Sequence, residues 1–210
     1  TNVNLAGFTK IRNVICDDLS VASVGEDVDF VNVNAGSVSI ACRYLSVYNS
    51  EIRFPSEPNI TAMWANDSRV FGSYKFTSNN KQYVFDNCYV GISFDRATDN
   101  VSDESFLEFR KCEFQENCIL YSKRLILDSC MIHNNGIKVY PYKDNENKYR
   151  MYCKFINNSF DTSTPIEFTK FDLLNGAYQD DVFEIIANWE ICNNLFVGNN
   201  EGLRCRYWQH

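Results

Sequence analysis

A short phrase recurs at least seven times between residues 45 and 200, and this repetition constrains the fold more than any other feature of the 210-residue chain. Each copy ends on an apolar closing residue, with further apolar residues seven and five positions earlier. Asn or Asp usually stands three positions before the closing residue, and Ser, Cys or Asn stands two before it. Tyr83-Val-Phe85-Asp-Asn87-Cys88-Tyr-Val90 is a clear copy. The closing residues, spaced by 18 to 36 positions, are Ile52, Val70, Val90, Phe114, Ile132, Phe160 and Phe196.

The phrase has the local chemistry of a strand, a tight corner and a second strand. Apolar residues two apart, with polar residues between them, have the period of a strand with one buried face. Asn and Asp tolerate left-handed backbone and bond to their own main chain, so the polar pair predicts a one-residue corner. A lap of about 20 residues with these parts is typical of a coil of a parallel β-helix. An antiparallel β-sandwich, also built from short strands, stays open as the alternative.

Stacked coils would place equivalent residues in columns roughly 4.8 Å apart. Each coil is apolar on one side only, so the columns would form one cooperative core. The column seven positions before the closing residues contains Leu45, Met63, Tyr83, Leu107, Leu125, Cys153 and Trp189. The column five positions before them contains Val47, Ala65, Phe85, Phe109, Leu127, Phe155 and Ile191.

The repeat predicts a single all-β domain over residues 1–210. Residues 45–202 would hold the regular coils, residues 1–44 the N-terminal coils or a cap, and residues 203–210 the C-terminal end. The phase of the N-terminal part stays open, because only 14 positions separate Val38 from Ile52, fewer than a lap needs. Residues 1–10 and 203–210 are candidates for covering the two ends. Otherwise a partner subunit would cover them, as in a homo-trimer or a larger assembly.

The charge balance excludes some partners. The chain carries 20 Lys and Arg against 27 Asp and Glu, a net charge of −7, with a pI near 4.9. Phosphate backbones are bound by basic surfaces, so this balance argues against a nucleic-acid partner. No stretch of 18 apolar residues occurs, so we predict no membrane span.

The nine cysteines do not form a legible metal site, because no Cys-x-x-Cys pair occurs and only two His are present. We therefore predict no metal and no cofactor. Cys88, Cys112 and Cys130 occupy the same position of three successive copies. Their stacked Cβ atoms would be about 4.8 Å apart, which is too far for a disulfide, whose Cβ atoms lie about 3.8 Å apart. Free thiols, buried as small apolar groups, are the better interpretation. They favour folding in a reducing cytoplasm, whatever the final location.

Three long connections follow the closing strand, at residues 95–105, 141–150 and 161–182. By the phase of the repeat they should leave the stack on roughly the same side, which is often the binding face of a repeat protein. Aromatic rings together with carboxylates suit a sugar or a polar protein surface. The candidate ligand-binding residues are Asp95, Arg96, Asp103, Glu104, Tyr140, Tyr142, Lys143, Tyr149, Asp180 and Asp181.

The columns and the Asn-rich turn over about residues 45–200 resemble the right-handed parallel β-helix proteins of the pectate-lyase-like superfamily, which include phage tailspikes and adhesins. The resemblance implies a right-handed solenoid of roughly eight coils with loop insertions on one side. Catalytic members of that superfamily cleave or modify acidic polysaccharides. The Gly-His-Gly and Arg-x-Lys elements of galacturonase-type hydrolases are missing here, and His133 at a turn is typical of a surface histidine. We assign no catalytic residue and no metal ligand.

These observations lead to the expectation of a non-catalytic module, a rigid rod whose loops recognise a glycan or a protein surface. A piece of a virion tail fibre or spike, or a surface adhesin, would have this character. Two alternatives stay open. One is a polysaccharide lyase or glycoside hydrolase whose carboxylates converge only in three dimensions. The other is a cytosolic inhibitor or immunity-type protein, which the acidic, thiol-rich composition would suit.

Overall fold

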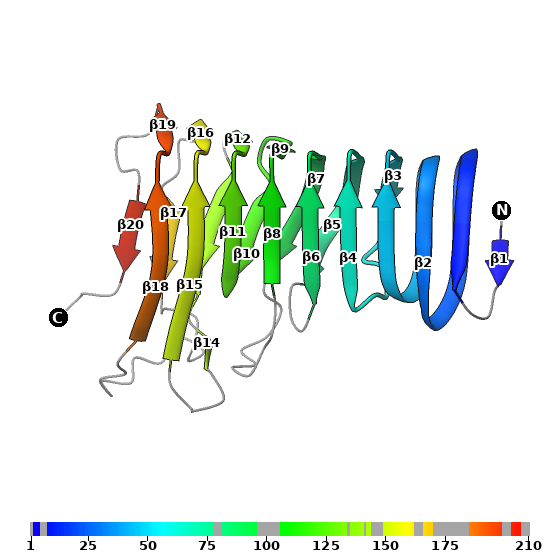
Figure 1. The fold of residues 1–210 in the computed structure, drawn as a ribbon, viewed down its shortest axis with the longest axis horizontal. Helices are drawn as coiled ribbons and strands as arrows, with labels where there is room; N and C mark the ends of the chain where they lie inside the picture. The colour runs from blue at the N-terminus through cyan, green and yellow to red at the C-terminus, as the bar shows by residue number, and fades with distance from the viewer. Residues whose placement is uncertain are drawn as a thin grey trace.

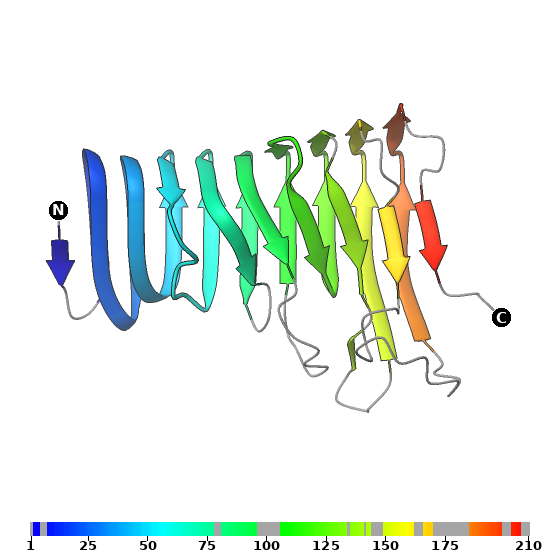
Figure 2. The ribbon, with the colours of Figure 1, turned by 180° about the vertical axis from the view of Figure 1, so that it is seen from behind.

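The computed structural model describes residues 2–4, 8–77, 81–95, 106–133, 135–140, 142–143, 149–161, 166–169, 185–198 and 203–206. Within these ranges the chain is all β, with strands and no helix. The strands pair in parallel, mostly with the equivalent strand of the next repeat, and only the β14–β15 pair is antiparallel. Figures 1 and 2 show the strands stacked along one long axis, with β1 and β20 at opposite ends.

The strands form three columns, each extended by one strand per repeat. The first column contains parts of β2 (Thr9–Tyr48), then β4 (Ala62–Asn66), β6 (Gln82–Asp86), β8 (Phe106–Arg110), β11 (Arg124–Asp128), β15 (Tyr149–Ile156) and β18 (Ile185–Cys192). The second contains parts of β2, then β3 (Glu51–Phe54), β5 (Arg69–Thr77), β7 (Tyr89–Asp95), β9 (Glu113–Phe114), β12 (Met131–His133), β16 (Ser159–Asp161) and β19 (Leu195–Val197). The third contains β1 (Asn2–Asn4), part of β2, the ends of β5 and β7, β10 (Ile119–Ser122), β13 (Gly136–Val139), β17 (Ile166–Thr169) and β20 (Leu203–Arg206).

The corner between the first and second columns is a single residue in left-handed backbone, as the phrase predicts. These corner residues have φ between 45° and 58°. Left-handed backbone costs most side chains roughly 1–2 kcal/mol, and Asn and Asp visit it more readily than other non-glycine residues. The nine corners are Asn13, Asn32, Asn49, Asp67, Asn87, Lys111, Ser129, Asn157 and Asn193. Neighbouring corners also bond to each other: Asn32 Nδ2 donates to Asn13 Oδ1 at 2.9 Å, and Asn49 Nδ2 donates to Asn32 Oδ1 at 2.7 Å.

The predicted columns are confirmed residue by residue. Tyr83 pairs with Met63 before it and Leu107 after it, and Phe85 likewise pairs with Ala65 and Phe109. The same register continues through β11, β15 and β18 to Trp189 and Ile191. Because equivalent apolar residues lie one above another, the buried side chains form one continuous core.

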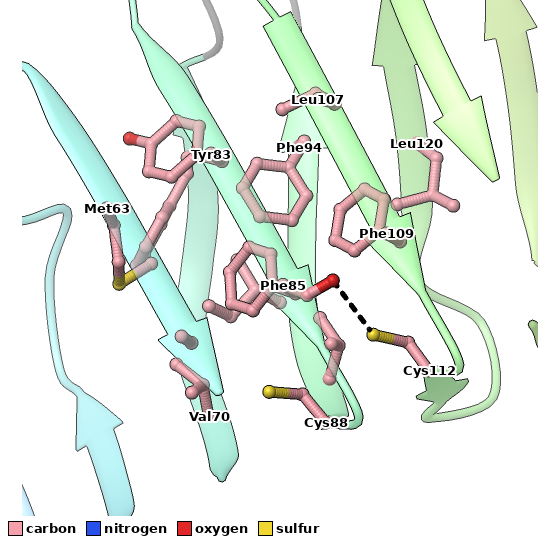
Figure 3. Close-up of a cluster of buried hydrophobic side chains, with 14 of the residues drawn as sticks. Met63, Val70, Tyr83, Phe85, Cys88, Phe94, Leu107, Phe109, Cys112 and Leu120 are labelled. Atoms are coloured by element: carbon pink, nitrogen blue, oxygen red, sulfur yellow. Dashed lines mark hydrogen bonds between the residues drawn. The ribbon is translucent and has the colours of Figure 1, made fainter. Parts of the chain in front are cut away.

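Aromatic rings fill the middle of this core (Figure 3). Phe94, on the third-column part of β7, packs against Tyr83 and Phe109 from the first column, with ring centroids 5.0 and 5.7 Å apart. The side chains come from different columns and meet in the interior, so burying them depends on the columns facing one another. Each buried ring removes a large apolar area from water, which is the main stabilising contribution in such a stack.

The residue after each corner points into the core and bonds across repeats. Ser50 Oγ accepts from Val33 N at 2.9 Å, and Ser68 Oγ accepts from Ser50 N at 3.1 Å. Asn158 does more: its Oδ1 accepts from Cys130 N at 2.9 Å, and its Nδ2 donates to Leu127 O at 2.9 Å. Serine and asparagine recur at this position because a buried backbone group next to a tight corner needs a side-chain partner.

Cysteine occupies this same inward position in three successive repeats. Cys88, Cys112 and Cys130 are buried. None of them forms a disulfide, and the same holds for the other cysteines whose side chains are described. The Cys112 thiol lies 3.5 Å from Phe85 O and 3.2 Å from Arg110 O, so it acts as a weak donor within the column (Figure 3). The prediction of free, buried thiols is confirmed for this column.

The N-terminal phase, left open by the sequence, is resolved by the pairing of β2 with β3. Ala35 pairs with Ile52, so Ala35 and not Val38 is the closing residue, and the lap is 17 residues long. The corner of that repeat is Asn32, and the repeat before it turns at Asn13. The phrase is disguised there because the residue after Asn32 is Val33, which is apolar, and because Ala35 is small.

No helix in the described ranges has the length and apolar character that crossing a membrane requires.

Candidate binding edge

The chain passes from the third column to the first at one edge of the stack. β7 ends at Asp95 and β8 begins at Phe106, while β17 ends at Thr169 and β18 begins at Ile185. These strands are in parallel register with their neighbours, so the ends of successive connections lie in a line. In Figure 1 the strand ends that flank these connections lie at the lower edge of the stack.

The predicted grouping of the long connections is supported by the strands that flank them, with one correction. Residues 95–105 and 141–150 lie between the third and first columns, as expected. The range 161–182 is divided, because residues 166–169 form β17 and pair with β13. Only the part after Thr169 therefore starts at this edge. The earlier part comes between β16 of the second column and β17 of the third.

Part of the predicted loop at 141–150 is a strand pair. β14 (Tyr142–Lys143) pairs antiparallel with the beginning of β15. β15 and β18 also begin three residues earlier than the register of β11 requires, with Tyr149 paired to Ile185. These strands extend the sheet beyond the edge, as the lower part of Figure 1 shows. A paired extension holds its residues more firmly than a free loop would.

A row of outward side chains from the third column runs beside this edge. Thr77 pairs with Asp95, and Leu120 pairs with Phe94, which sets Tyr121 beside Asp95. Tyr121 pairs with Lys138, and Lys138 pairs with Glu167. We call these five residues, Thr77, Asp95, Tyr121, Lys138 and Glu167, the edge row. Each comes from a different repeat, so the row exists only through strand pairing.

The charges of the edge row are paired. Lys75 Nζ lies 3.3 Å from Asp95 Oδ2, and Lys138 Nζ lies 3.4 Å from Glu167 Oε2. Glu57 closes the N-terminal end of the row, accepting from Thr77 Oγ1 at 2.6 Å and from Lys81 Nζ at 2.5 Å. Partly exposed pairs of this kind contribute at most about 1 kcal/mol each to stability. Their main effect is to fix donors and acceptors in place along the surface.

An aromatic pair stands in the middle of the row. The Tyr121 and Tyr140 rings meet edge to face at 6.1 Å, and Lys138 Nζ lies 5.0 Å from the Tyr121 ring centroid. Tyr140 is buried, and its backbone N–H donates to Ser122 O at 2.9 Å. Tyr140 therefore supports the half-exposed Tyr121 from below.

A second aromatic group lies on the first-column side, in earlier repeats. Tyr44 and Trp64 have ring centroids 5.4 Å apart, and Trp64 is exposed. The Arg43 guanidinium lies 4.8 Å from the Tyr44 ring centroid and donates to Asp27 Oδ1 at 2.9 Å. The sequence analysis did not identify this group, because Tyr44 and Trp64 occupy outward positions that the phrase leaves unspecified.

Lys123 forms the shortest connection at the edge, between Ser122 and Arg124, and only 1% of it is exposed. Buried lysine is rare, because its ammonium group must be paired to offset the loss of hydration. The Ser122 hydroxyl donates to Arg124 O at 2.9 Å and helps to hold this one-residue turn. No sequence pattern marked Lys123, because its burial depends on the repeats on either side.

One buried hydroxyl lies behind Glu57. The Tyr83 hydroxyl is buried and has no hydrogen-bond partner among the described residues. Burial first, and the charge of Glu57 second, raise the pKa of Tyr83 above its ordinary value. The hydroxyl therefore stays protonated over the physiological range and cannot serve as a base.

The predicted binding residues are distributed unevenly over this edge. Asp95 lies in the edge row, and Tyr140 lies beneath it. The backbones of Tyr142, Lys143 and Tyr149 are part of the β14–β15 pair. Outside the described residues lie Arg96, Asp103, Glu104, Asp180 and Asp181.

His133 lies away from this edge, on the outward face of β12. Its Nε2 is 3.9 Å from Glu113 Oε1 and its Nδ1 is 4.0 Å from Asp161 Oδ2, both longer than a hydrogen bond. Within the described ranges, no three His, Cys, Asp or Glu side chains converge on a point that could hold a metal ion. The described part of the edge thus offers donors, acceptors and rings arranged in a line.

Comparison of the chain with protein-family models, with curated proteins and with solved structures finds no match.

Proposed function

We propose that the parallel stack closes as a right-handed β-helix of roughly eight coils, and that this solenoid is a non-catalytic module that binds a glycan along its loop-bearing edge. A protein surface is the other ligand class that the sequence allows. Paired polar groups around a ring favour the glycan. A rigid rod with one binding edge suits a surface appendage, such as an adhesin or a piece of a virion fibre or spike.

The observation that carries this proposal is the position of the edge row beside the line of connections. Tyr121 presents a ring, and Lys138 and Glu167 hold charged groups on one side of it. Sugar rings stack on aromatic faces, and their hydroxyls bond to oriented charged groups. Successive repeats place these groups at the strand spacing of about 4.8 Å, close to the length of a sugar residue, so a chain ligand could bind several repeats.

The pairing of charges supports binding over catalysis. A general acid or base needs a carboxylate or amine whose pKa is shifted toward neutrality and which can reach the reacting atom. In the edge row, Asp95 and Glu167 are each held by a lysine. Carboxylates held by a lysine in this way serve as fixed hydrogen-bond acceptors.

The test is a glycan array with the full chain, followed by titration calorimetry of any ligand found. We expect Tyr121→Ala to weaken binding by about tenfold or more, which corresponds to roughly 1.4 kcal/mol or more. Lys138→Gln should weaken it as well, while keeping the fold. Tyr89→Ala is the matched control, because Tyr89 is a partly exposed ring on the second column, away from the edge.

Three results would contradict the proposal. If Tyr89→Ala weakened binding and Tyr121→Ala did not, the binding site would lie on another face of the stack. Turnover of an acidic polysaccharide, detected as unsaturated products or new reducing ends, would show an enzyme instead. Absence of any glycan ligand, together with a tight one-to-one complex with a basic protein, would favour the inhibitor class.

A further inference from the structure

The described residues leave the inward columns incompletely covered at both ends of the stack. In the inner repeats the column that contains Trp189 is buried almost completely, whereas Trp189 itself is 39% exposed. Ile191 and Phe196 of the same repeat are also only partly buried. At the opposite end Ile11 and Cys16 are likewise only partly buried. Each terminal repeat thus presents one side of its apolar interior.

We propose that the end formed by β18, β19 and β20 binds the N-terminal end of a second copy of this chain, head to tail. Residues 9–17 of the second copy would then continue the first and second columns as the next repeat. The two ends match because the first and last repeats have the same architecture, with Asn13 and Asn193 as equivalent corners. Pairing at these ends would cover two open strand edges, which otherwise remain available to other chains.

Charge is complementary across such a joint. The position three before the corner is Lys154 in the last repeat but one and Glu190 in the last, and these pair at 2.9 Å. The same position is Lys10 in the first repeat and Asp29 in the second, paired at 3.4 Å. Head-to-tail contact would place Glu190 beside Lys10 of the second copy and continue the alternation of charge. Opposite charges at this point favour this register over a shifted one.

Apolar side chains also match on the outward face. Two positions after the corner, Leu195 is 60% exposed at one end and Ile15 is 86% exposed at the other. In a continuous stack these two would be neighbours in one column and would cover each other. Inside, Ile191 would meet Ile11, and Phe196 would meet Cys16. Each contact follows from the register that the inner repeats already show.

The direction of the hydrogen bonds fits the same joint. In the corner ladder, Asn32, Asn49 and Asn87 each donate Nδ2 to the corner of the preceding repeat. Asn13 of the second copy would donate in the same way to Asn193 Oδ1 of the first. The main chain of each corner donates in the opposite direction, to the following repeat: Asn157 N donates to Cys192 O at 3.2 Å, and Asn193 N would donate to Arg12 O of the second copy.

β1 competes with this joint. It pairs with Ser20, Val21 and Ala22 at the N-terminal edge of the third column. β20, the last strand of that column, would reach the same three residues in a continuous stack. A second copy can therefore dock only when β1 has left the edge. Because the joined surfaces differ, the contact repeats without closing and would give linear rods.

The experiment compares full chains by sedimentation velocity and electron microscopy over a range of concentrations. Val3→Pro weakens the pairing of β1, since proline cannot donate to a strand ladder. We expect this variant to form rods at a concentration about tenfold or more below that of the unchanged chain, a shift of roughly 1.4 kcal/mol. Adding Leu195→Arg should abolish the rods, because it places a charge in the apolar contact. Met131→Arg is the matched control, being 49% exposed at the same position of an inner repeat, and should leave them intact.

Circular dichroism establishes first that each variant keeps its β signal. A folded Val3→Pro chain that stays monomeric at all concentrations overturns the proposal. So do rods that persist with Leu195→Arg, or rods that Met131→Arg disrupts as strongly as Leu195→Arg does.

Discussion

Phe85 and Phe109 lie one above the other in successive repeats, with ring centroids 5.1 Å apart and ring planes only 11° from parallel. They are 24 residues apart in sequence, and they pair directly in the first column. Parallel strands in register place identical side chains face to face, so one aromatic ring per repeat produces a stack.

Truncating one ring of this stack should leave a cavity that the fixed register cannot close. We expect Phe85→Ala to lower the free energy of unfolding by about 3–5 kcal/mol, measured by urea denaturation. Val84→Ala, on the outward face of the same strand, is the control and should cost less than about 1 kcal/mol. Equal losses from the two substitutions would show that the ring is not packed as described.

Two corners carry residues poorly suited to left-handed backbone. Lys111 has φ of 51° and Ser129 has φ of 58°, where six other corners have Asn. Replacing Lys111 by Gly removes the clash of Cβ with the backbone, so Lys111→Gly should raise stability by about 1 kcal/mol. Gln82→Gly, within β6, should instead lower it by about 0.5–1 kcal/mol. Destabilisation by Lys111→Gly would argue against the corner geometry.

Asn158 bonds to three neighbours inside the core, including Cys130 N and Leu127 O. Asn158→Leu keeps the approximate volume but leaves buried backbone groups without partners. We expect a loss of about 2–6 kcal/mol, because two backbone groups lose their partner at about 1–3 kcal/mol each. Asn158→Ser should be milder, because Ser50 and Ser68 fill the same position in other repeats. Thermal unfolding of both variants tests this account, which would be contradicted if Asn158→Ser were less stable than Asn158→Leu.

Buried thiols should make the protein less stable in alkali. Burial, with Asp27 as a second cause, raises the pKa of Cys42 to about 12, and burial raises that of Cys118 to about 11, from an ordinary value of 9.0. The unfolded chain loses these protons first, so the stabilisation is complete below pH 9 and is lost as pH rises toward 11–12. Urea unfolding at pH 8 and 10.5 should show this decline.

Two substitutions separate the thiols from other groups that titrate in this range. Cys42→Ala combined with Cys118→Ala should flatten the decline, whereas Cys192→Ala, at an exposed thiol, should not. An unchanged slope in the double variant would assign the alkaline loss to other groups.

The repeated phrase was sufficient to predict the parallel columns, because each column position has its own chemistry. Phe85, Leu127 and Phe155 are apolar for burial, and Asn87 suits a left-handed corner. The same reasoning missed the phase of the first repeats, where Val33 and Ala35 do not match the phrase. Asn32 was the remaining signal there, because Asn adopts left-handed backbone more readily than the valines on either side of it.

The edge was predicted only in outline. The lengths of the laps showed where insertions leave the stack, but the partners Lys75 and Asp95, or Glu57 and Lys81, are separated by 20 or more residues and meet only through pairing. Tyr140 looked like a surface ring but is buried, and its ring packs against Tyr121 of the preceding repeat. Such features depend on neighbouring repeats, and one copy of the phrase carries no information about them.

The most direct test of the stacked architecture is a pair of distances between spin labels, measured by pulsed electron paramagnetic resonance in a Cys192→Ser background. Asn34, Met131 and Leu195 occupy the same outward position of three repeats, so distances between them should grow with the number of repeats crossed. We expect about 24 Å between labels at 34 and 131, five repeats apart, and about 34 Å between labels at 34 and 195, seven repeats apart. Two distances that are equal, or in the reverse order, would contradict the stack.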